Sequence, residues 1–451
     1  HVKERMIMLL VGAGKLITRD PAQPFLENGC VAMDEKGLIA AVGDTDALKA
    51  RYPGAEFLDA AGCVIMPGLI NAHNHTYSAF ARGLSVKGYA PKGFLDVLEG
   101  MWWTLDRNLS VENTMLSAQA CFIECVENGV TTVIDHHAGY GGVEGSLAAI
   151  AGQADRFGLR ACLCYEVSDR EGPELMRRAV AENTGFMEWA AKQSGDKIFG
   201  MMGMHAQFTL SNETLEYCMS RIPQGTGCHI HVAEGIDDVY LCLKEHGKRP
   251  VFRLHDHGVL GENTILGHCT HVSEAEMDLI KGSDTMVVHN PESNMGNAVG
   301  CPPVLSMVQK GILIGLGTDG YTQDMLESYK VANLLHKHNL CDPAAAWGEI
   351  PEMLFGNNAR MCSRMMEKPV GILKEGAHGD LIVIDYDPPT PMGESNINGH
   401  ILFGMNGRMV RDTVAGAKIL MRDRTLTLVD KAEILAKCRE GAKDLWARIN
   451  G

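Results

Sequence analysis

Three histidines and an aspartate stand where they could bind a metal ion. His73 and His75 are two residues apart, and His231 and Asp319 lie at the ends of other short apolar runs. Side chains two apart on a strand point to the same side, so both imidazoles can converge on one ion. Three imidazoles and a carboxylate suit one divalent metal with a position open for water, and we expect Zn²⁺, with Fe²⁺ as the alternative. The competing interpretation is a set of unrelated polar strand ends.

A hydrolytic metal site also needs a group that moves protons, and Glu234 is the candidate. It follows His231 by three residues, where the chain turns out of an apolar run. Its side chain can therefore share a cavity with the metal. The alternative is a solvated acid that opens the next helix. His268 is expected to orient and deprotonate the water together with Asp319, because Asp319 already completes the set of metal ligands.

Other aromatic and imidazole side chains have two interpretations each. Trp102 and Trp103 lie in a long segment after the first barrel run, and one of them can stack on a planar substrate while the other packs in the core. His136 and His137 either line the rim of the site or have a structural role. His229 is expected to pack in the core or to support a metal ligand from behind.

These residues follow a repeated pattern of apolar runs and amphipathic segments, which is typical of βαβ units. Eight such units predict an α/β protein with a (β/α)₈ TIM barrel, whose strand ends carry the catalytic residues. The eight runs are Val64–His73, Thr131–Asp135, Leu159–Val167, Ile198–Ala206, Gly227–Ala233, Thr264–His271, Thr285–His289 and Leu313–Thr318.

The two flanks of the barrel read as short strands between glycine and aspartate turns. Neither flank is long enough to bury a core alone, so we expect both to form one small composite β-sandwich domain. The predicted division is residues 1–63 for its N-terminal part and 64–368 for the barrel. Residues 369–451 then supply its C-terminal part and a terminal helix.

Composition limits the partners. The 451 residues carry 56 acidic and 41 basic side chains, a formal charge of −15, so nucleic acid and anionic membranes are not expected as partners. The 14 cysteines include no Cys-x-x-Cys pair and are scattered through apolar segments. They are interpreted as reduced core thiols, which predicts a cytoplasmic protein.

The motifs together resemble the amidohydrolase superfamily, specifically its mononuclear-zinc aminohydrolases such as guanine deaminase, S-adenosylhomocysteine deaminase and the triazine hydrolases. The resemblance spans nearly the whole chain. The motifs are Pro67-Gly68-Leu69-Ile70-Asn71-Ala72-His73-Asn74-His75, His231-Val232-Ala233-Glu234, Leu266-Gly267-His268, His289-Asn290-Pro291-Glu292-Ser293-Asn294 and Gly317-Thr318-Asp319-Gly320.

The resemblance implies roles for matching positions. It implies metal ligation by His73, His75, His231 and Asp319, proton shuttling by Glu234, and water activation by His268 with Asp319. It further implies substrate contact by His205 after the fourth strand. We also expect Asn290, Asn294 and Trp102 to bind the substrate.

The sequence also departs from parts of that superfamily. Dinuclear members place a carboxylated lysine at the end of the fourth strand, whereas residues 203–207 contain no lysine. S-adenosylhomocysteine deaminases usually follow the histidine of this strand with Ser-Pro-Tyr, but Ala206-Gln207-Phe208 stands here. Guanine deaminases tend to carry arginine near this point. One metal ion is therefore expected, and neither of these two substrates is favoured.

The expected function is hydrolytic deamination of an amino-substituted nitrogen heterocycle that resembles a purine, pterin or pyrimidine. The expected substrate is a small molecule. The chain is also expected to form a homo-oligomer, with a dimer as the first choice. The alternatives are hydrolysis of a cyclic amide, displacement of another leaving group as in triazine hydrolases, and a metal-bearing binding scaffold without catalysis.

Overall fold

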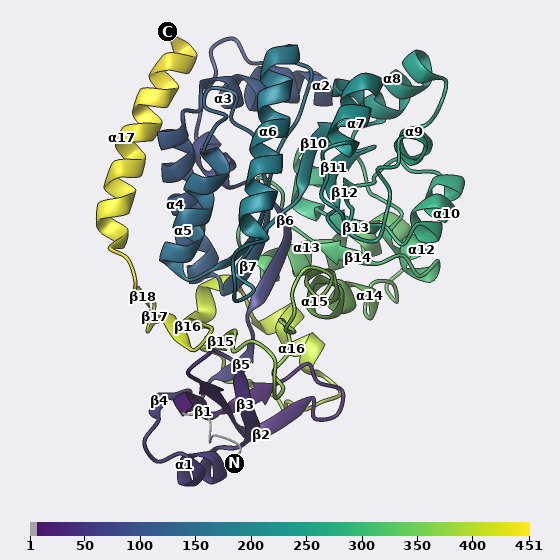
Figure 1. Ribbon diagram of the computed structural model, residues 1–451. Coiled ribbons are helices and arrows are strands. Elements are labelled where there is room, and N and C mark those ends of the chain that lie inside the picture. Colours follow the sequence, from purple (N-terminus) through teal and green to yellow (C-terminus); the bar gives the residue numbers. More distant parts are fainter. Residues whose placement is uncertain (1–6) are drawn as a thin grey trace.

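The computed structural model describes residues 7–451, so the first six residues of the predicted N-terminal part lie outside the described range. Its centre is a ring of parallel strands, drawn from dark purple to green in Figure 1. The barrel strands are β6 (Leu69–Asn74), β7 (Val130–His137), β8 (Arg160–Tyr165), β9 (Ile198–Gly200), β10 (Met202–Ala206), β11 (Cys228–Val232), β12 (Ile265–His268), β13 (Met286–His289) and β14 (Ile314–Leu316).

The strands form two parallel arcs, β6-β7-β8-β9 and β10-β11-β12-β13-β14. Two isolated parallel bridges join the arcs, one between Val167 and Met204 and one between Asn74 and Asp319. The fourth barrel position is thus shared by β9 and β10, which are separated at Met201. The ring closes, and the predicted (β/α)₈ barrel is confirmed.

Amphipathic helices surround the strands, and several begin at the polar residues expected as caps. The hydroxyl oxygen of Ser110, for example, accepts from the amide of Asn113 (3.2 Å) at the start of α4. The helices of the barrel and its loops are α2 (Phe94–Val97), α3 (Trp103–Asn108), α4 (Val111–Glu127), α5 (Ser146–Phe157), α6 (Pro173–Ala190), α7 (Asn212–Met219), α8 (Ile236–His246), α9 (Pro250–Asp256), α10 (Glu274–Gly282), α11 (Pro291–Gly296), α12 (Val304–Gln309), α13 (Met325–Leu340), α14 (Glu349–Pro351) and α15 (Asn358–Cys362).

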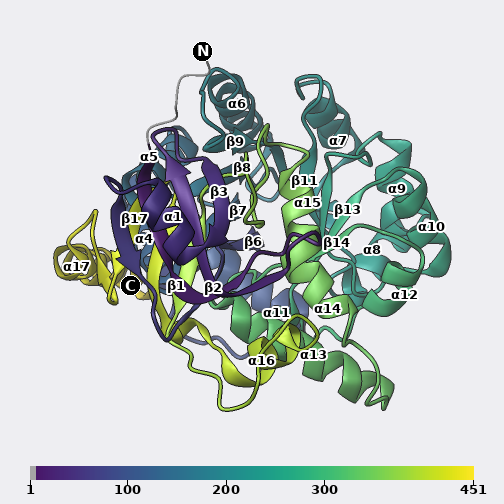
Figure 2. The ribbon, with the colours of Figure 1, turned by 90° about the horizontal axis from the view of Figure 1, so that it is seen from below.

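Strands from both flanks form the composite domain below the barrel (Figures 1 and 2). They make one hydrogen-bonded sheet that divides at β1, because one part of this long strand pairs with β4 and another with β5. The strands of the composite domain are therefore connected in one sheet and do not form two separate sheets. The strands are β1 (Ile7–Ile17), β2 (Phe25–Asp34), β3 (Ile39–Asp44), β4 (Glu56–Asp59), β5 (Val64–Pro67), β15 (Leu381–Ile384), β16 (Val410–Ala415), β17 (Lys418–Arg422) and β18 (Thr425–Leu426), and α1 (Thr45–Arg51) packs beside them.

The predicted first barrel strand, Val64–His73, is two strands in the structure. β5 pairs antiparallel with β15 in the composite sheet, whereas β6 pairs with β7 in the barrel. The break falls at Gly68, where an added Cβ would lie 2.3 Å from Oγ1 of Thr131. Both halves are buried and apolar, so the sequence pattern could not separate them. The chain thus passes from one sheet to the other at Gly68, and the predicted domain boundary at residue 64 stays a prediction.

The C-terminal helix α17 (Lys431–Asn450) lies along the barrel beside α4, and not in the composite sheet (Figure 1). Its Trp446 Nε1 donates to the carbonyl oxygen of Phe80 (2.8 Å), in the 3₁₀ helix η1 (Thr76–Ala81). The other helix of this region, α16 (Ile397–Gly404), contacts α13. The C-terminal segment thus supports the loop that follows β6.

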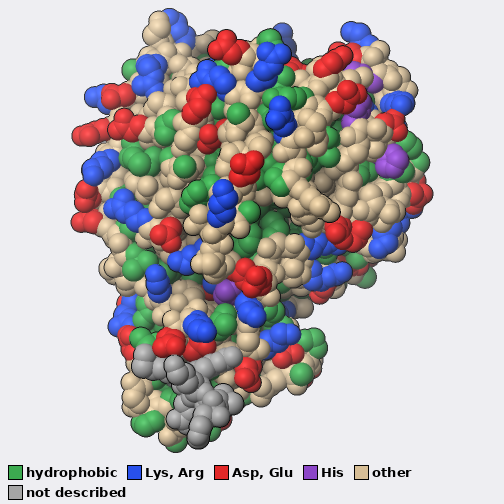
Figure 3. Space-filling model, viewed as in Figure 1, with side chains coloured by type: hydrophobic (Ala, Val, Ile, Leu, Met, Phe, Trp, Pro, Cys, Tyr) green, Lys and Arg blue, Asp and Glu red, His purple; other side chains and the backbone are tan. Residues whose placement is uncertain are grey.

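The surface is mixed in charge. Figure 3 shows Lys and Arg side chains interspersed with Asp and Glu on one face. All 14 cysteines are free thiols, and 12 of them are buried. Within residues 7–451, no helix has both the length and the apolar character needed to cross a membrane.

Candidate metal centre and pocket

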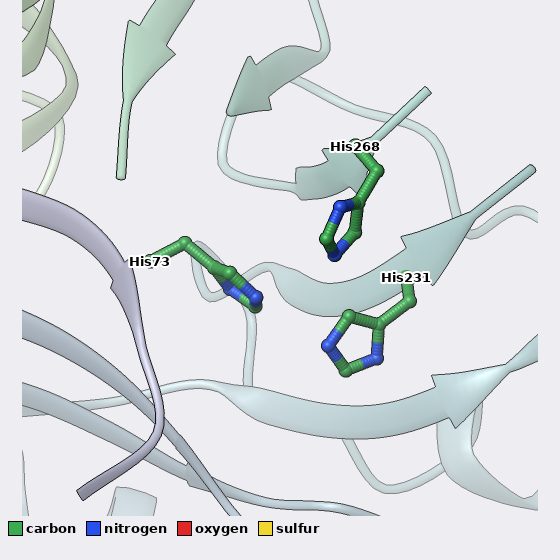
Figure 4. Close-up of side chains that lie close together, drawn as sticks. All are labelled: His73, His231 and His268. Atoms are coloured by element: carbon green, nitrogen blue, oxygen red, sulfur yellow. The ribbon is translucent and has the colours of Figure 1, made fainter. Parts of the chain in front are cut away.

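Three histidines from different barrel strands converge at the carboxyl ends of the strands. His73 comes from β6, His231 from β11 and His268 from β12, and Figure 4 shows their rings pointing toward a common region. Each offers a ring nitrogen, and these three atoms lie within 4.8 Å of one another. The predicted convergence of residues far apart in the sequence is therefore present.

His75 and Asp319 complete the cluster. His75 Nε2 lies 2.9 Å from Oδ1 of Asp319 and 3.2 Å from Nε2 of His231. Asp319 follows β14 in the left-handed backbone region, with φ of 55°. Its amide donates to the carbonyl oxygen of His73 (3.0 Å), which joins the first and last barrel strands at the site. All four predicted metal ligands thus lie together.

The donor atoms fit a divalent metal. The outer nitrogens of the ligands are already engaged: Nδ1 of His75 lies 2.5 Å from the carbonyl oxygen of His136, and Nδ1 of His231 lies 2.8 Å from that of His205. Nδ1 of His73 lies 2.8 Å from Nε2 of His229. Among residues 7–451, His73 Nε2 finds no hydrogen-bond partner although it is buried. Such a set holds each ring so that its other nitrogen can bind a cation.

The protonation of the cluster also favours a cation. Burial and the neighbouring imidazoles hold the pKa of His73 and of His231 well below the usual value, so both rings are neutral and can bind metal. Burial lowers the pKa of His75, but the Asp319 carboxylate outweighs it and raises that pKa to about 9. A divalent metal would take the place of this proton beside Asp319.

Glu234 lies next to the cluster. It follows Ala233, which has φ of 48°, so the chain turns out of β11 and brings the carboxylate over the strand ends. Its Oε2 is 3.5 Å from Nε2 of His268, and its Oε1 accepts from Nδ2 of Asn297 (3.3 Å). Burial raises the pKa of Glu234 to about 7, which suits a group that both gives and takes protons near neutral pH.

His268 lies between two carboxylates. Its Nε2 is 3.7 Å from Oδ2 of Asp319 on one side and faces Glu234 on the other. Asn294 Oδ1 lies 3.2 Å from Nδ1 of His268 and so fixes its ring, while Asn294 Nδ2 donates to Oγ1 of Thr270 (2.6 Å). This placement allows His268 either to orient water or to bind the metal directly.

A pocket opens beside these residues. One part of its wall is aromatic or apolar, formed by Tyr77, Phe94, Leu98, Trp102, Trp103 and Tyr321. Trp102 lies 6.1 Å from Tyr77, measured between ring centroids, at almost a right angle. Flat walls of this kind suit a planar ring.

The predicted substrate contacts are placed differently from one another. Trp102 and His205 line the pocket, and Nδ1 of His205 lies 2.8 Å from Oγ1 of Thr209. Asn290 and Asn294 are fully buried, and neither is among the described residues that line the pocket. Asn294 instead holds His268. A direct contact between substrate and these two asparagines stays a prediction.

Some pocket residues were not predicted from the sequence. Asp106 lies in α3, Glu166 directly follows β8, and Asn297 and Tyr321 lie in loops after β13 and β14. Glu166 is the next-to-last residue of the predicted run Leu159–Val167, so its acidic type near a strand end was a usable signal. The loop residues gave no comparable signal, because nothing in a loop's sequence fixes which way it faces.

Curated relatives cover nearly the full length of the chain. A 5′-deoxyadenosine deaminase of Methanosarcina mazei is 29% identical over 99% of this chain and 100% of its own. A 5-methylthioadenosine/S-adenosylhomocysteine deaminase of Thermococcus onnurineus is 31% identical over 82% of this chain and 85% of its own.

Solved structures share the fold. An adenosine deaminase from Xanthomonas campestris with bound zinc has a TM-score of 0.86 and 21% identity, covering 97% of this chain and 98% of its own. Guanine deaminase of E. coli has a TM-score of 0.78 and 18% identity, covering 92% of this chain and 100% of its own.

Two family models match parts of the chain. Residues 35–55 match the imidazolonepropionase-like composite domain of bacteria. Residues 64–420, which include the barrel and its histidine cluster, match the amidohydrolase family. The chain belongs to the amidohydrolase family.

Proposed function

We propose that this chain is a metal-dependent hydrolytic deaminase that releases ammonia from an amino-substituted, purine-like heterocycle. The observation that carries the proposal is the position of Glu234, whose buried carboxylate faces His268 at the edge of the histidine cluster. The curated relatives named above are deaminases of adenosine-type compounds, which supports the reaction and the purine-like class. A role in purine catabolism would follow.

The residues divide the chemistry between them. His73, His75, His231 and Asp319 would hold one divalent metal, which when bound lowers the pKa of water and stabilises developing negative charge. His268 and Asp319 would orient the attacking water and accept its proton. Glu234 would protonate the ring nitrogen and then the leaving amine, for which a pKa of about 7 is well matched.

The pocket walls would position the ring. Trp102 offers a flat face for stacking, and His205 lies near the metal ligands, with its ring 5.8 Å from that of His231. Asn294 would act through His268, which it orients, and Asn290 is proposed as a further polar contact.

The metal is proposed to be Zn²⁺, with Fe²⁺ as the alternative, because three imidazoles and one carboxylate suit both ions. Elemental analysis of the purified protein should find about one divalent ion per chain, since β10 ends without the lysine that could bridge a second ion. Two tightly bound ions would contradict this.

We further propose a homo-oligomer, a dimer in the first place, in the cytoplasm. Apolar side chains are exposed near α13 and α16, including Leu334, Trp347 and Phe403, and the rings of the last two are 5.9 Å apart. Such a patch suits an interface between copies. Light scattering should give twice the monomer mass, and Phe403→Glu should lower it; a monomeric wild-type protein would refute the dimer. The free thiols suit a reducing compartment.

The reaction is tested by measuring ammonia from a panel of amino-purines, amino-pyrimidines, pterins and aminotriazines. Ammonia release with loss of one amine from the product supports the proposal. Ring opening without ammonia would indicate a cyclic amide hydrolase, and release of another group would indicate triazine-type displacement. Tight binding with no turnover of any compound would indicate a metal-bearing scaffold.

A further inference from the structure

Among the described residues, those that line the pocket include carboxylates but no lysine or arginine. Apart from histidines, the charged side chains among its described lining residues are all carboxylates: Asp106, Glu166, Glu234 and Asp319. Glu234 and Asp319 already have roles in the proposed reaction. Asp106 and Glu166 have none, and both are almost fully buried. Buried carboxylates without a role in the chemistry need another explanation.

Arg170 holds these two carboxylates together from behind the pocket wall. Its Nη2 donates to Oδ2 of Asp106 (2.9 Å) and to Oε1 of Glu166 (3.2 Å). Its guanidinium carbon lies 4.5 Å from the ring centroid of Trp103, which lines the pocket, and its Nε donates to Oγ of Ser168 (3.1 Å). Arg170 is therefore fixed in position, and it does not itself line the pocket.

The cluster still has hydrogen-bonding capacity that the described chain does not use. Oδ1 of Asp106 and Nε1 of Trp103 are buried and have no partner in residues 7–451. One is an acceptor and the other a donor, and both residues line the pocket. An unpartnered buried acceptor is costly, and burial raises the pKa of Asp106 to about 7. A ligand that donates an N–H or O–H group would remove this cost.

The cluster begins close to the metal end of the pocket. A carboxylate oxygen of Glu166 and ring nitrogens of His205 and His231 lie within 4.8 Å of one another. Oε1 of Glu166 is 3.9 Å from Nε2 of His205. Glu166 therefore lies beside His231, and Asp106 and Trp103 line the same pocket.

We propose that Asp106 and Glu166, positioned by Arg170, form a carboxylate subsite that selects the substrate by charge. The subsite takes a neutral or cationic heterocycle with N–H or O–H donors, and it excludes compounds that carry a carboxylate or phosphate. This inference rests on the proposed deaminase function. It separates the chain from an S-adenosylhomocysteine deaminase, since that substrate carries an amino-acid carboxylate.

The physical reason is the charge balance of the subsite. Two carboxylates share one guanidinium, and the pocket walls beside them are aromatic. An anionic substituent would meet like charge in a poorly solvated place, whereas a donor would fill the vacant acceptor of Asp106. Selection would thus combine attraction of the right substrate with repulsion of the wrong one.

The first test uses the wild-type protein loaded with metal. Ammonia release is measured for adenosine, 5′-amino-5′-deoxyadenosine and adenosine 5′-monophosphate, and for a pterin and its 6-carboxylate. We expect kcat/KM of the neutral or cationic compound to exceed that of its anionic counterpart by at least about 100-fold. An anionic compound within tenfold of its neutral counterpart would overturn the proposal.

Two variants test the named residues. Asp106→Asn and Glu166→Gln each remove one negative charge at nearly constant shape, and each should lower the neutral-to-anionic ratio by about tenfold with unchanged metal content. Glu144→Gln is the matched control, because Glu144 pairs with Arg178 on the surface and should leave the ratio unchanged. A ratio that stays at the wild-type value in both pocket variants would refute the subsite.

The outcome can be separated from the fate of the proposed reaction. If no compound releases ammonia, the deaminase function fails, and calorimetry with the same pairs then tests the subsite alone. Tighter binding of the neutral or cationic compound would support the subsite. Equal or tighter binding of the anionic compound, or no binding by any of them, would overturn it.

Discussion

Buried charges occur at both ends of the barrel, and at its base each side-chain nitrogen and oxygen of the Arg160–Asp380 pair has a hydrogen-bond partner. Arg160, at the start of β8, donates from Nε to Oδ2 of Asp380 (2.7 Å) and from Nη2 to Oδ1 (3.2 Å). Its Nη1 donates to the carbonyl oxygen of Asp196 (2.7 Å), and the amide of Gly416 donates to Oδ1 of Asp380 (2.9 Å). This pair joins the barrel to the composite domain, and none of its side-chain nitrogens and oxygens is left without a partner.

At the pocket end, by contrast, the described chain leaves buried polar atoms without partners. They include Nε2 of His73, Nε2 of His268, Oδ1 of Asp106 and Nη1 of Arg170. Each such atom costs stability in the absence of a ligand. In this comparison the fully partnered pair joins two domains, whereas the unpartnered atoms lie around the proposed metal and substrate site.

The largest effect is expected at a metal ligand. His231→Ala should lose the metal and reduce turnover to background, while the barrel stays folded, because its large apolar core does not depend on one ion. Elemental analysis, turnover and circular dichroism on the same sample check this. His255→Ala, on the surface, is the control. Wholesale unfolding of His231→Ala would break the comparison, since the pocket would then be a structural centre.

Glu234→Gln should lose activity and keep both metal and fold. The amide has almost the same shape but cannot shuttle a proton, so kcat should fall by roughly 10² to 10⁴. Turnover and metal content are measured together. If Glu234 only capped a helix, near-normal turnover and about 1 kcal/mol of lost stability would result. An active variant would assign the proton transfers to His268.

At the base of the barrel we expect the opposite of the Glu234 result, namely a loss of stability without a loss of activity. Arg160→Met leaves the Asp380 carboxylate buried and unpaired, which should lower the free energy of unfolding by about 3 to 5 kcal/mol without changing kcat at a permissive temperature. Urea denaturation and turnover check this. The double variant Arg160→Met/Asp380→Leu should recover much of the stability, because no unpaired charge remains. A large loss of kcat in the folded single variant would show that the two regions are coupled.

The smallest effect is expected in how the free energy of unfolding changes at acidic pH. Burial raises the pKa of Asp380, but the Arg160 guanidinium outweighs it and leaves that pKa below its usual value. The unfolded carboxyl titrates at about 3.9, so the pair stabilises the fold above that pH, and this contribution is lost as the pH falls through the lower folded value. Denaturation between pH 6 and acid should therefore show a shallower pH dependence in the double variant than in wild type. Identical slopes would contradict the role of this pair.

The sequence predicted that His73, His75, His231 and Asp319 lie together because barrel strands are short and regular, whereas their binding of a metal stays a prediction. Alternation placed His73 and His75 on one side, and the ends of parallel strands meet at one edge, which brought in His231 and Asp319. The backbone turns at Ala233 and Asp319 that aim the side chains could not be read from these residue types.

The sequence failed where tertiary context decides the outcome. The apolar run around Gly68 has the same composition on both sides, so its division between two sheets was hidden. Asp106 lies in α3 and Arg170 in the loop between β8 and α6, and an ion pair joins them. Such pairs depend on how loops fold over the barrel, and hydrophobic periodicity carries no information about it.

The pairing of β5 with β15 has a consequence for folding during synthesis, because the ribosome makes these two strands at different times. β5 ends at Pro67, whereas its partner begins at Leu381, so most of the barrel is translated between them. At ribosomal speeds of about 5 to 20 residues per second, this interval lasts on the order of 15 to 60 s. During that time the nascent N-terminal sheet carries an open edge able to pair with foreign strands. Slower translation would lengthen this exposure.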